Sequence, residues 1–200
     1  PGGALTMTPS AGSAIGHRRE VVPSSVLGML VFIATEMMFF TGLFSAFTIT
    51  RAGSAPLSWT LPAGLVLPVA QTAFNSVALL ASGVLAFVAY RQFRRIDMAT
   101  AARTLLAATL LGSLFVVLQG REWWSLLSQG VTMQSTPLSA FFYLIVGTHA
   151  VHAVAAIIGL AVAWGRLRSG SLSSGFLFGA LTFWYFVVGV WPVIYFRVYF

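Results

Sequence analysis

The stretch Val31-Phe-Ile-Ala-Thr-Glu-Met-Met-Phe-Phe-Thr-Gly-Leu-Phe-Ser-Ala-Phe47 decides the fold, because it belongs to an apolar run long enough to cross a bilayer. It carries a single carboxylate, Glu36, near its middle. An ionised carboxylate at that depth is costly, so Glu36 must be protonated, paired, or turned toward protein or water. The helical stripe around Glu36 is otherwise apolar, so any polar partner must come from another helix.

Small residues form a ridge on a neighbouring face of the same predicted helix. The ridge consists of Gly28, Thr35, Gly42 and Ala46. Small side chains allow two transmembrane helices to approach each other closely. We therefore expect this helix to contact another helix on the face beside Glu36.

The composition is that of an integral membrane protein. Of 200 residues, 58% are hydrophobic and only 8% are charged, which leaves too little polar surface to cover a water-soluble globule of this size. The net charge of +7 is explained first by membrane topology and anionic lipid headgroups, and nothing in the sequence supports nucleic-acid binding. Cysteine is absent, which excludes disulfides, thiolate metal sites and a cysteine nucleophile.

Five apolar segments predict an all-α, polytopic membrane protein, a bundle of five transmembrane helices. We expect a flexible tail over residues 1–24, rich in Gly, Ser, Ala and Pro, and one membrane domain over residues 25–200. The predicted helices span approximately 25–50, 65–91, 103–126, 138–164 and 175–197. The positive-inside rule favours a cytoplasmic N-terminus and an external C-terminus, because this orientation leaves only Arg51, Arg121 and Arg197 outside.

Amide and hydroxyl side chains within the predicted helices indicate contacts between helices. Asn75 and Ser82 lie on one stripe of the second helix, and such side chains commonly hydrogen bond across helices in lipid. Gln119 and Glu122 share a face near the outer end of the third helix. Two interpretations of Glu122 remain open: it is hydrated at the interface, where it can pair with Arg121, or it belongs to a buried polar cluster.

His149 and His152 lie one turn apart on the fourth predicted helix. Two histidines at this spacing can ligate one metal ion, but two ligands alone do not make a metal site, and we predict none. The favoured interpretation is buried hydrogen bonding with Glu122 or Glu36 as partner, within an intramembrane polar cluster of Gln119, Glu122, His149 and His152. With three histidines and no thiolate, the chain is not expected to carry haem or copper centres of its own.

Several large side chains are expected at the lipid interface. Trp123 and Trp124 follow Arg121 at the outer end of the third helix, and Trp184 and Trp191 lie seven residues apart on the fifth. Interfacial tryptophans lie at headgroup depth, and arginines reach lipid phosphates. We interpret these residues as packing residues and membrane anchors rather than as a cofactor cage.

Five motifs occur in order along the chain. They are Thr35-Glu-Met-Met-Phe-Phe-x-Gly-Leu-Phe44, Asn75-Ser-Val-Ala-Leu-Leu-Ala-Ser-Gly83, Leu111-Gly-x-x-Phe-x-x-x-Gln-x-x-Glu-Trp123, Gly147-Thr-His-Ala-Val-His152 and Trp184-x-Phe-Val-x-x-Val-Trp191. Each alone is a weak signal, but together they are specific. In content and order the chain resembles subunit III of the haem-copper terminal oxidases, the cytochrome c and quinol oxidase superfamily, in its five-helix bacterial form.

The resemblance implies a non-catalytic accessory subunit of an aerobic respiratory oxidase in the bacterial inner membrane. Such a subunit packs on the catalytic subunit I, with subunit II and further small subunits as additional partners. Haem and copper are expected in those partners, so the chain would be a component of an oxidoreductase complex without carrying its redox centres. The resemblance also implies that the chain binds phospholipid, supports proton uptake and protects the enzyme during turnover.

The last helix departs from the family pattern Trp-His-Phe-Val-Asp, because Tyr185 and Val188 replace the His and the Asp. This departure leaves open a subunit III-like protein of a nitric oxide reductase or of another respiratory supercomplex. The intramembrane Glu36, Glu122 and histidines leave two more alternatives, an ion or proton transporter and a metal-dependent membrane enzyme. The sequence shows no inverted repeat, which counts against the transporter.

Overall fold

The described part of the chain is entirely helical. The computed structural model describes residues 24–55, 59–62, 65 and 67–199. These residues form α1 (Ser24–Gly53), α2 (Val69–Arg94), α3 (Met98–Ser128), α4 (Pro137–Arg168) and α5 (Ser174–Val198). The predicted all-α class is thus confirmed for these residues, while the tail predicted for residues 1–24 lies outside them except for Ser24.

Local capping explains where the helices begin. Asp97 caps α3, where its side chain accepts a hydrogen bond from the Thr100 backbone N–H at 3.2 Å, so α3 starts five residues before the predicted segment. At α4, Thr136 and Ser139 form a capping box. By contrast, α2 starts later than predicted because Pro68 occupies its N-cap position, and proline is poorly tolerated inside a helix. The apolar runs locate the helices, and the polar caps set their starts.

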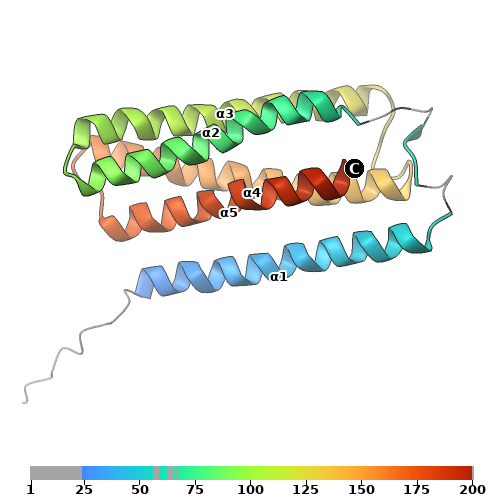
Figure 1. Cartoon of the computed structure of the whole chain (residues 1–200), viewed down its shortest axis with the longest axis horizontal. Coiled ribbons are helices and arrows are strands. Elements are labelled where there is room, and N and C mark those ends of the chain that lie inside the picture. The colour runs from blue at the N-terminus through green and yellow to red at the C-terminus, as the bar shows by residue number, and fades with distance from the viewer. Residues whose placement is uncertain (1–23, 56–58, 63–64, 66, 200) are drawn as a thin grey trace, which may run out of the picture.

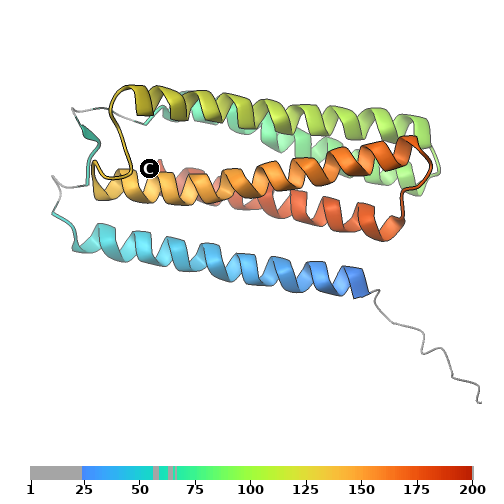
Figure 2. The ribbon, with the colours of Figure 1, turned by 180° about the vertical axis from the view of Figure 1, so that it is seen from behind.

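Helices α2 to α5 pack as a bundle, and α1 lies along one side of it (Figure 1). The view from behind shows the same separation of α1 from the other four helices (Figure 2). Only 6% of the central apolar span of α1 is buried, against 33–44% of the corresponding spans in the other helices. Helix α1 is therefore a peripheral element that contacts α5 and, less extensively, α4.

The small-residue ridge of α1 does not make the predicted helix contact within this chain. Residues Gly28, Thr35, Gly42 and Ala46 are all exposed. A Cβ atom added at Gly28 or Gly42 would meet no atom within 4 Å. Instead, α1 packs on the bundle through large aromatic side chains, among them Phe40 and Phe47, each 2% exposed. The ridge is left facing outward.

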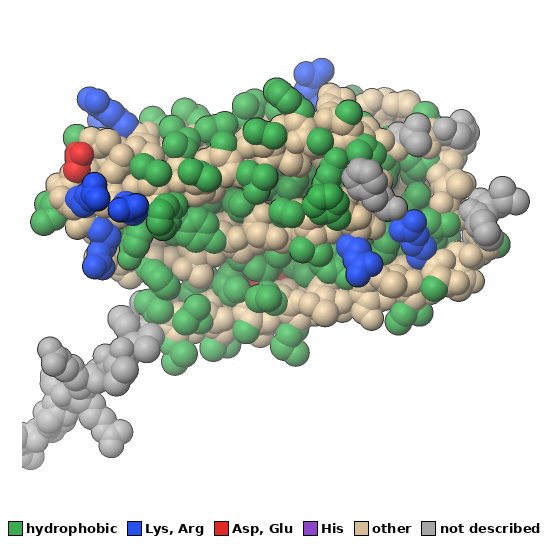
Figure 3. Space-filling model, viewed as in Figure 1, with side chains coloured by type: hydrophobic (Ala, Val, Ile, Leu, Met, Phe, Trp, Pro, Cys, Tyr) green, Lys and Arg blue, Asp and Glu red, His purple; other side chains and the backbone are tan. Residues whose placement is uncertain are grey.

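The surface matches a membrane-embedded bundle. All five described helices are long and apolar enough to cross a membrane. Hydrophobic side chains cover the visible length of the bundle, whereas the charged side chains gather toward its two ends (Figure 3). The loop end that joins α2 to α3 and α4 to α5 contains Arg91, Arg94, Arg95, Arg103, Arg166 and Arg168. The charge distribution thus marks two interfacial zones separated by an apolar band.

Tryptophans fill the centre of the bundle. Trp184 and Trp191 are 0% and 1% exposed. A Cβ atom at Gly112 on α3 would lie only 2.6 Å from Cη2 of Trp184, so glycine is required where the indole lies against α3. This position differs from the lipid interface expected for both tryptophans. Helices in a membrane associate through close van der Waals packing, and the two large rings supply these contacts in the core of the bundle.

Candidate functional site

Glu36 finds its partner on α4. Its Oε2 atom lies 2.9 Å from Nε2 of His152, and the two side chains are 19% and 15% exposed respectively. The other ring nitrogen, Nδ1, lies 2.8 Å from the carbonyl oxygen of Thr148. The contact joins residues 116 positions apart in sequence and links the peripheral α1 to the bundle.

The neighbours of His152 determine how many protons the pair holds. A carbonyl oxygen only accepts hydrogen bonds, so Nδ1 of His152 must carry a hydrogen toward Thr148. The contact between Nε2 and Glu36 then needs one further proton, held either by the carboxyl group or by the imidazole ring. The pair therefore shares one proton in either a neutral or an ion-paired form.

Aromatic rings enclose the imidazole side of this pair. The ring centroids of Phe40, Phe183 and Phe186 lie 5.5, 6.1 and 6.2 Å from that of His152. These rings cover part of the imidazole, while the Glu36 side chain stays 19% exposed.

Glu122 lies in a different environment, inside the bundle. Its side chain is 4% exposed and accepts hydrogen bonds from the hydroxyl group of Thr72 at 2.8 Å, Nδ2 of Asn75 at 2.7 Å and Nε2 of Gln119 at 3.0 Å. Two of these donors come from α2, so the carboxylate joins α2 to α3. Three donors compensate for the removal of the carboxylate from water.

The Glu122 network continues toward the end of the chain and toward the surface. Nε2 of Gln119 also donates to the hydroxyl oxygen of Tyr199 at 3.1 Å. A polar hollow of about 210 Å³ lies beside the carboxylate and opens between the ends of α2 and α3; it is lined by Pro68, Gln71, Arg121, Glu122, Ser125, Leu126 and Gln129. Glu122 is thus buried but adjacent to a polar opening.

The four residues predicted to form one polar cluster are divided between separate environments. Gln119 and Glu122 are bonded to each other, while His152 pairs with Glu36 on α1. His149 is 2% exposed, and its ring lies 5.1 Å from that of Trp191, centroid to centroid. The direct Glu122–histidine pairing considered from the sequence is not among the contacts of the described residues. Glu122 is surrounded instead by donors from α2.

Sequence reasoning missed two members of the Glu122 network. Thr72 precedes Asn75 by three residues, so the two lie on the same face of α2, and this spacing was a usable signal. Tyr199 follows the last turn of α5 and is buried by the packing of α5 against its neighbours, which no local pattern indicates. Its position depends on tertiary structure alone.

Other hydroxyl groups also join helices. Ser82 on α2 donates to the carbonyl oxygen of Ala108 on α3 at 2.9 Å. Nε1 of Trp191 donates to the hydroxyl oxygen of Ser76 at 2.7 Å. Together with Asn75, these side chains fix α2 against α3 and α5.

The C-terminal end of α3 presents side chains to different surroundings. Trp124 is 75% exposed, and Arg121 is also exposed. Trp123 is half-buried, because its ring lies against α4, where a Cβ atom at Gly147 would come within 2.9 Å of it. Trp124 and Arg121 therefore lie at the surface of the bundle, whereas Trp123 mainly packs within it.

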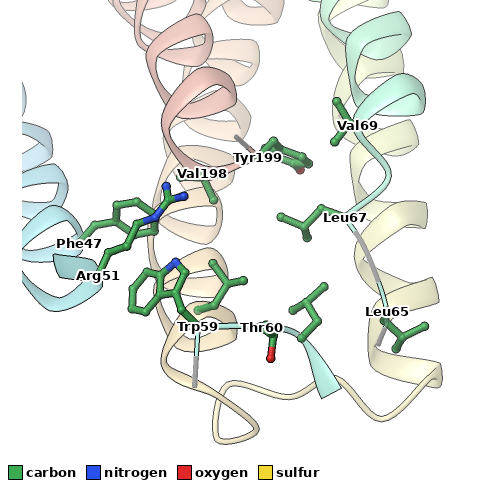
Figure 4. A pocket seen from close by; sticks show the side chains of 11 residues that line it. Phe47, Arg51, Trp59, Thr60, Leu65, Leu67, Val69, Val198 and Tyr199 are labelled. Atoms are coloured by element: carbon green, nitrogen blue, oxygen red, sulfur yellow. The ribbon is translucent and has the colours of Figure 1, made fainter. Parts of the chain in front are cut away.

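Two hollows lie along the boundary between α1 and α5. The larger, about 460 Å³, is almost wholly apolar and is lined by Ile33, Met37, Phe40, Thr41, Phe44, Thr182, Tyr185, Phe186, Gly189, Val190 and Val193. The second, about 270 Å³, lies near the C-terminal ends of α1 and α5, where Phe47 and Arg51 of α1 and Trp59 of the following segment line it together with Val198 and Tyr199 (Figure 4). The boundary therefore combines a long apolar groove with an arginine at one end.

The two residues of α5 that depart from the family pattern, Tyr185 and Val188, have distinct surroundings. Tyr185 lines the apolar groove and is 38% exposed. Val188 faces α2, where a Cβ atom at Gly83 would lie 3.1 Å from its Cγ1 atom. The apolar valine therefore fits a close contact between helices, and the tyrosine faces the groove.

Metal-ligating side chains do not gather among the described residues. No three His, Asp or Glu side chains lie close enough there to hold one ion. The chain has no cysteine. Each of the two intramembrane carboxylates is bonded to protein side chains, as described above.

Comparison with known proteins gives a consistent result. Residues 9–200 match the family described as cytochrome c oxidase subunit III. A subunit 3 of cytochrome c oxidase from Corynebacterium diphtheriae is 30% identical over 94% of this chain and 98% of its own length. The subunits 3 from Lumbricus terrestris and Loxodonta africana are also 30% identical over 94% of this chain, but the match covers 74% of their lengths. In length the chain is thus similar to the bacterial relative.

Proposed function

Because the chain belongs to the cytochrome c oxidase subunit III family, we propose that it is the non-catalytic accessory subunit of an aerobic respiratory haem-copper oxidase. The observation that carries the proposal is the match over residues 9–200, which includes all five helices. Family membership implies other oxidase subunits as partners. The chain packs on the catalytic subunit I, and subunit II and smaller subunits complete the complex.

The side-chain inventory supports a subunit without redox centres of its own. Haem and copper are held by histidines, cysteines or methionines at defined spacings. The chain has no cysteine, and of its intramembrane histidines, His152 is bonded to Glu36 and Thr148. Haem and copper therefore belong to the partner subunits. The chain contributes to the reaction of the complex indirectly.

Helix α1 is the element best suited to contact the catalytic subunit. It buries little of its surface in this chain, and its outward ridge includes Gly42. Small residues let a second transmembrane helix approach closely. Since the chain has no cysteine, Gly42→Cys and a control on α4, the exposed Ala155→Cys, each place one photo-crosslinker at a known position. Crosslinking to a haem-bearing subunit is expected from position 42 and not from position 155.

The groove between α1 and α5 is the proposed phospholipid site. Its apolar lining and volume of about 460 Å³ suit an acyl chain. Arg51 lies at the outer end of the same boundary, where a guanidinium group can contact a lipid phosphate (Figure 4). Lipid analysis of the purified complex should find phospholipid that is retained by the native chain and reduced when the groove is filled by Gly189→Leu.

The Glu36–His152 pair is the element proposed to support proton uptake by the catalytic subunit. It holds one shared proton and lies partly exposed between α1 and α4. Such a pair can accept or release a proton with little rearrangement of heavy atoms. Glu122, fixed by three donors, is proposed to hold helices together rather than to exchange protons.

The proposed location is the cytoplasmic membrane of a bacterium, with the N-terminus inside. The near-complete coverage of the Corynebacterium relative supports the bacterial form. The end of the bundle with Arg94, Arg103 and Arg166 would face the cytoplasm, in line with the positive-inside rule. Labelling of a single cysteine in the α2–α3 loop, reached only from the cytoplasmic side, would test this orientation.

Removal and return of the subunit test the function as a whole. The oxidase is purified, depleted of this chain with detergent, and compared with the native complex during sustained turnover. We expect the depleted enzyme to keep its haem and copper and its initial rate of electron transfer, but to lose activity sooner. Adding back the chain should restore the lifetime. Loss of haem or copper with the chain, or an unchanged lifetime after depletion, would contradict the proposal.

A further inference from the structure

A hollow lies at the arginine-rich end of the bundle, between the first turns of α3 and the last turns of α4. Its volume is about 260 Å³. The hollow is lined by Ala99, Ala102, Arg103, Leu106, Trp164 and Arg168. None of these residues lines the groove between α1 and α5, so the hollow is separate from the phospholipid site proposed there.

Helical spacing explains why these side chains lie together. The lining residues of α3 recur at intervals of three and four positions, and Trp164 and Arg168 on α4 are four positions apart, so each set occupies one face of its helix. Two of the α3 residues are alanines, which fill little space. The larger Leu106 and Trp164 add apolar surface beside them. The hollow therefore combines an apolar lining with two arginines, one from each helix.

The two arginines carry charge that the described part of the chain does not neutralise. Arg103 and Arg168 are both exposed. No carboxylate of the described residues forms an ion pair with either of them. The acidic residue that begins α3, Asp97, accepts a hydrogen bond from the backbone N–H of Thr100 and caps the helix. Two positive charges thus border one hollow without a counter-charge from these residues.

An aromatic ring holds Arg168 on the side of the hollow. The Cζ atom of Arg168 lies 5.7 Å from the centroid of the Trp164 ring, within the range of a cation–π contact. Arg166, two positions earlier on α4, turns to another neighbour, because its Cζ atom lies 4.3 Å from the ring centroid of Phe176 on α5. Of the two arginines in the last turn of α4, only Arg168 lines the hollow.

The lining selects a ligand with an anionic group and an apolar part. Guanidinium groups bind phosphate through charge-assisted hydrogen bonds, which are frequently bidentate. Basic pockets between transmembrane helices accordingly bind anionic lipid headgroups. Inorganic phosphate would satisfy the two arginines but not the apolar lining, whereas an uncharged acyl chain would do the reverse. A phospholipid satisfies both.

We propose that the hollow between α3 and α4 binds one anionic phospholipid. Its phosphate lies between the guanidinium groups of Arg103 and Arg168. Its glycerol and the first part of its acyl chains lie against Trp164, Leu106 and the two alanines. The lipid thereby links α3 to α4 at the arginine-rich end of the bundle.

The position of the hollow leaves it open to the bilayer when the chain has its partner. Both ribbon views place α3 on the far side of the bundle from α1 (Figures 1 and 2). Helix α1 is the element proposed above to contact the catalytic subunit. The lipid site and that contact therefore lie on different sides of the chain.

Two arginines of α2 provide a matched control. Arg91 and Arg94 are exposed and belong to the same end of the bundle, but they do not line the hollow. The double variant Arg91→Gln/Arg94→Gln removes the same charge from the same interfacial zone as Arg103→Gln/Arg168→Gln. All four positions are exposed, so neither double variant removes a core contact.

Photolabelling of the delipidated, purified complex with a photoreactive phosphatidylglycerol tests the proposal. The reactive group is placed near the glycerol, and mass spectrometry locates the labelled peptides. We expect label on residues 99–106 and 164–168, reduced several-fold in Arg103→Gln/Arg168→Gln and unchanged in Arg91→Gln/Arg94→Gln. No label on these segments, or an equal reduction in both double variants, would overturn the proposal.

Competition identifies the ligand. Unlabelled phosphatidylglycerol should displace the label, whereas phosphatidylcholine and, at constant ionic strength, inorganic phosphate should displace it several-fold less. Equal displacement by phosphatidylcholine would contradict recognition of the anionic headgroup, and equal displacement by inorganic phosphate would make free phosphate the ligand. Gly189→Leu, which fills the groove between α1 and α5, should leave this labelling unchanged, and its loss there would show that the two sites are not separate. The role proposed for the chain in the oxidase does not depend on these outcomes.

Discussion

Glu36 and Glu122 are both carboxylates in apolar helices, but the fold treats them differently. Glu122 is 4% exposed and accepts hydrogen bonds from three side chains on α2 and α3. Glu36 is 19% exposed and has one side-chain partner, His152, reached across the boundary between the peripheral α1 and the bundle. One carboxylate is a fixed junction between helices, and the other shares a proton at a boundary.

The difference shows that the depth of a carboxylate in the membrane does not by itself define its role. An intramembrane carboxylate is often functional. The number and rigidity of its hydrogen-bond partners separate a carboxylate that holds helices together from one that can exchange protons. Three donors on two helices hold the Glu122 carboxylate in place, because a movement of the carboxylate would break three hydrogen bonds and leave Asn75 without its acceptor. Glu36 has a single side-chain partner, His152, and this pair is the one proposed to exchange a proton.

The largest expected effect is the loss of stability in Glu122→Leu. Leucine leaves Nδ2 of Asn75 without its acceptor, and an unpaired buried donor costs roughly 1–3 kcal/mol. Thr72 and Gln119 each lose one hydrogen bond, worth about 0.5–1.5 kcal/mol, but keep a second acceptor in Pro68 and Tyr199. We expect the free energy of unfolding to fall by about 3 kcal/mol in a denaturant titration of the chain in detergent. The matched variant Glu36→Leu should cost clearly less, and equal losses would contradict the distinction between the two sites.

The second largest effect is expected when a methyl group is added in the packed bundle, compared with the same change on the peripheral helix α1. Gly112→Ala places a methyl group 2.6 Å from Cη2 of Trp184, and such overpacking costs about 1–3 kcal/mol. Gly42→Ala on α1 meets no atom within 4 Å and should not destabilise the isolated chain, since alanine favours helix. The melting temperatures of the two variants measure the difference. Similar decreases in both would show that α1 is packed as tightly as the bundle.

Removal of the Tyr199 hydroxyl group should have a smaller effect. Tyr199→Phe deletes one acceptor of Gln119 but leaves the bond from Gln119 to Glu122, so the cost is about 0.5–1.5 kcal/mol near neutral pH. Unfolding measured by denaturant titration would detect a change of this size. A loss as large as that of Glu122→Leu would show that Tyr199, and not Glu122, is the centre of the network.

The same variant tests the pH dependence of stability. Burial raises the pKa of Tyr199 above its usual value of 10.0, so the phenol ionises at lower pH in the unfolded chain than in the folded one. Stability is therefore independent of this group below pH 10, and it falls as pH rises above that value, because the unfolded state releases its proton first. Tyr199→Phe should show a shallower alkaline decline than the native chain. Identical slopes would contradict the burial of the phenol.

The smallest effect on stability is expected for Glu36→Gln. A glutamine amide can still donate to Nε2 of His152, and the site is partly exposed, so the change should be below about 0.5 kcal/mol. The measurement is again the free energy of unfolding in detergent. What the variant removes is the carboxyl group that is proposed to exchange the shared proton.

Much of the fold could be predicted from the sequence, because long apolar runs have few solutions in a membrane. The five helices fall where the runs indicate, and the polar caps at Asp97 and Thr136 account for shifts of their ends. The proximity of Gln119 to Glu122 follows from helical spacing. Motif order alone also indicated the family that the comparisons show.

The partners of the carboxylates could not be predicted, because they depend on how the helices pack. The sequence left Glu122 and Glu36 as alternative partners of the histidines, and only tertiary structure assigns Glu36 to His152. The burial of Trp184 depends in the same way on Gly112, a residue 72 positions away whose missing side chain makes room for the ring. Local patterns identify polar residues in membrane helices, but not which helix they face.

The rate of proton uptake by the complete oxidase, with Glu36→Gln in this chain, tests the account most directly. The variant complex is compared with the native one at equal haem and equal content of this chain, by following a pH-indicating dye during turnover. We expect an assembled and stable complex with slower proton uptake. Proton uptake at the native rate in a fully assembled Glu36→Gln complex would contradict it.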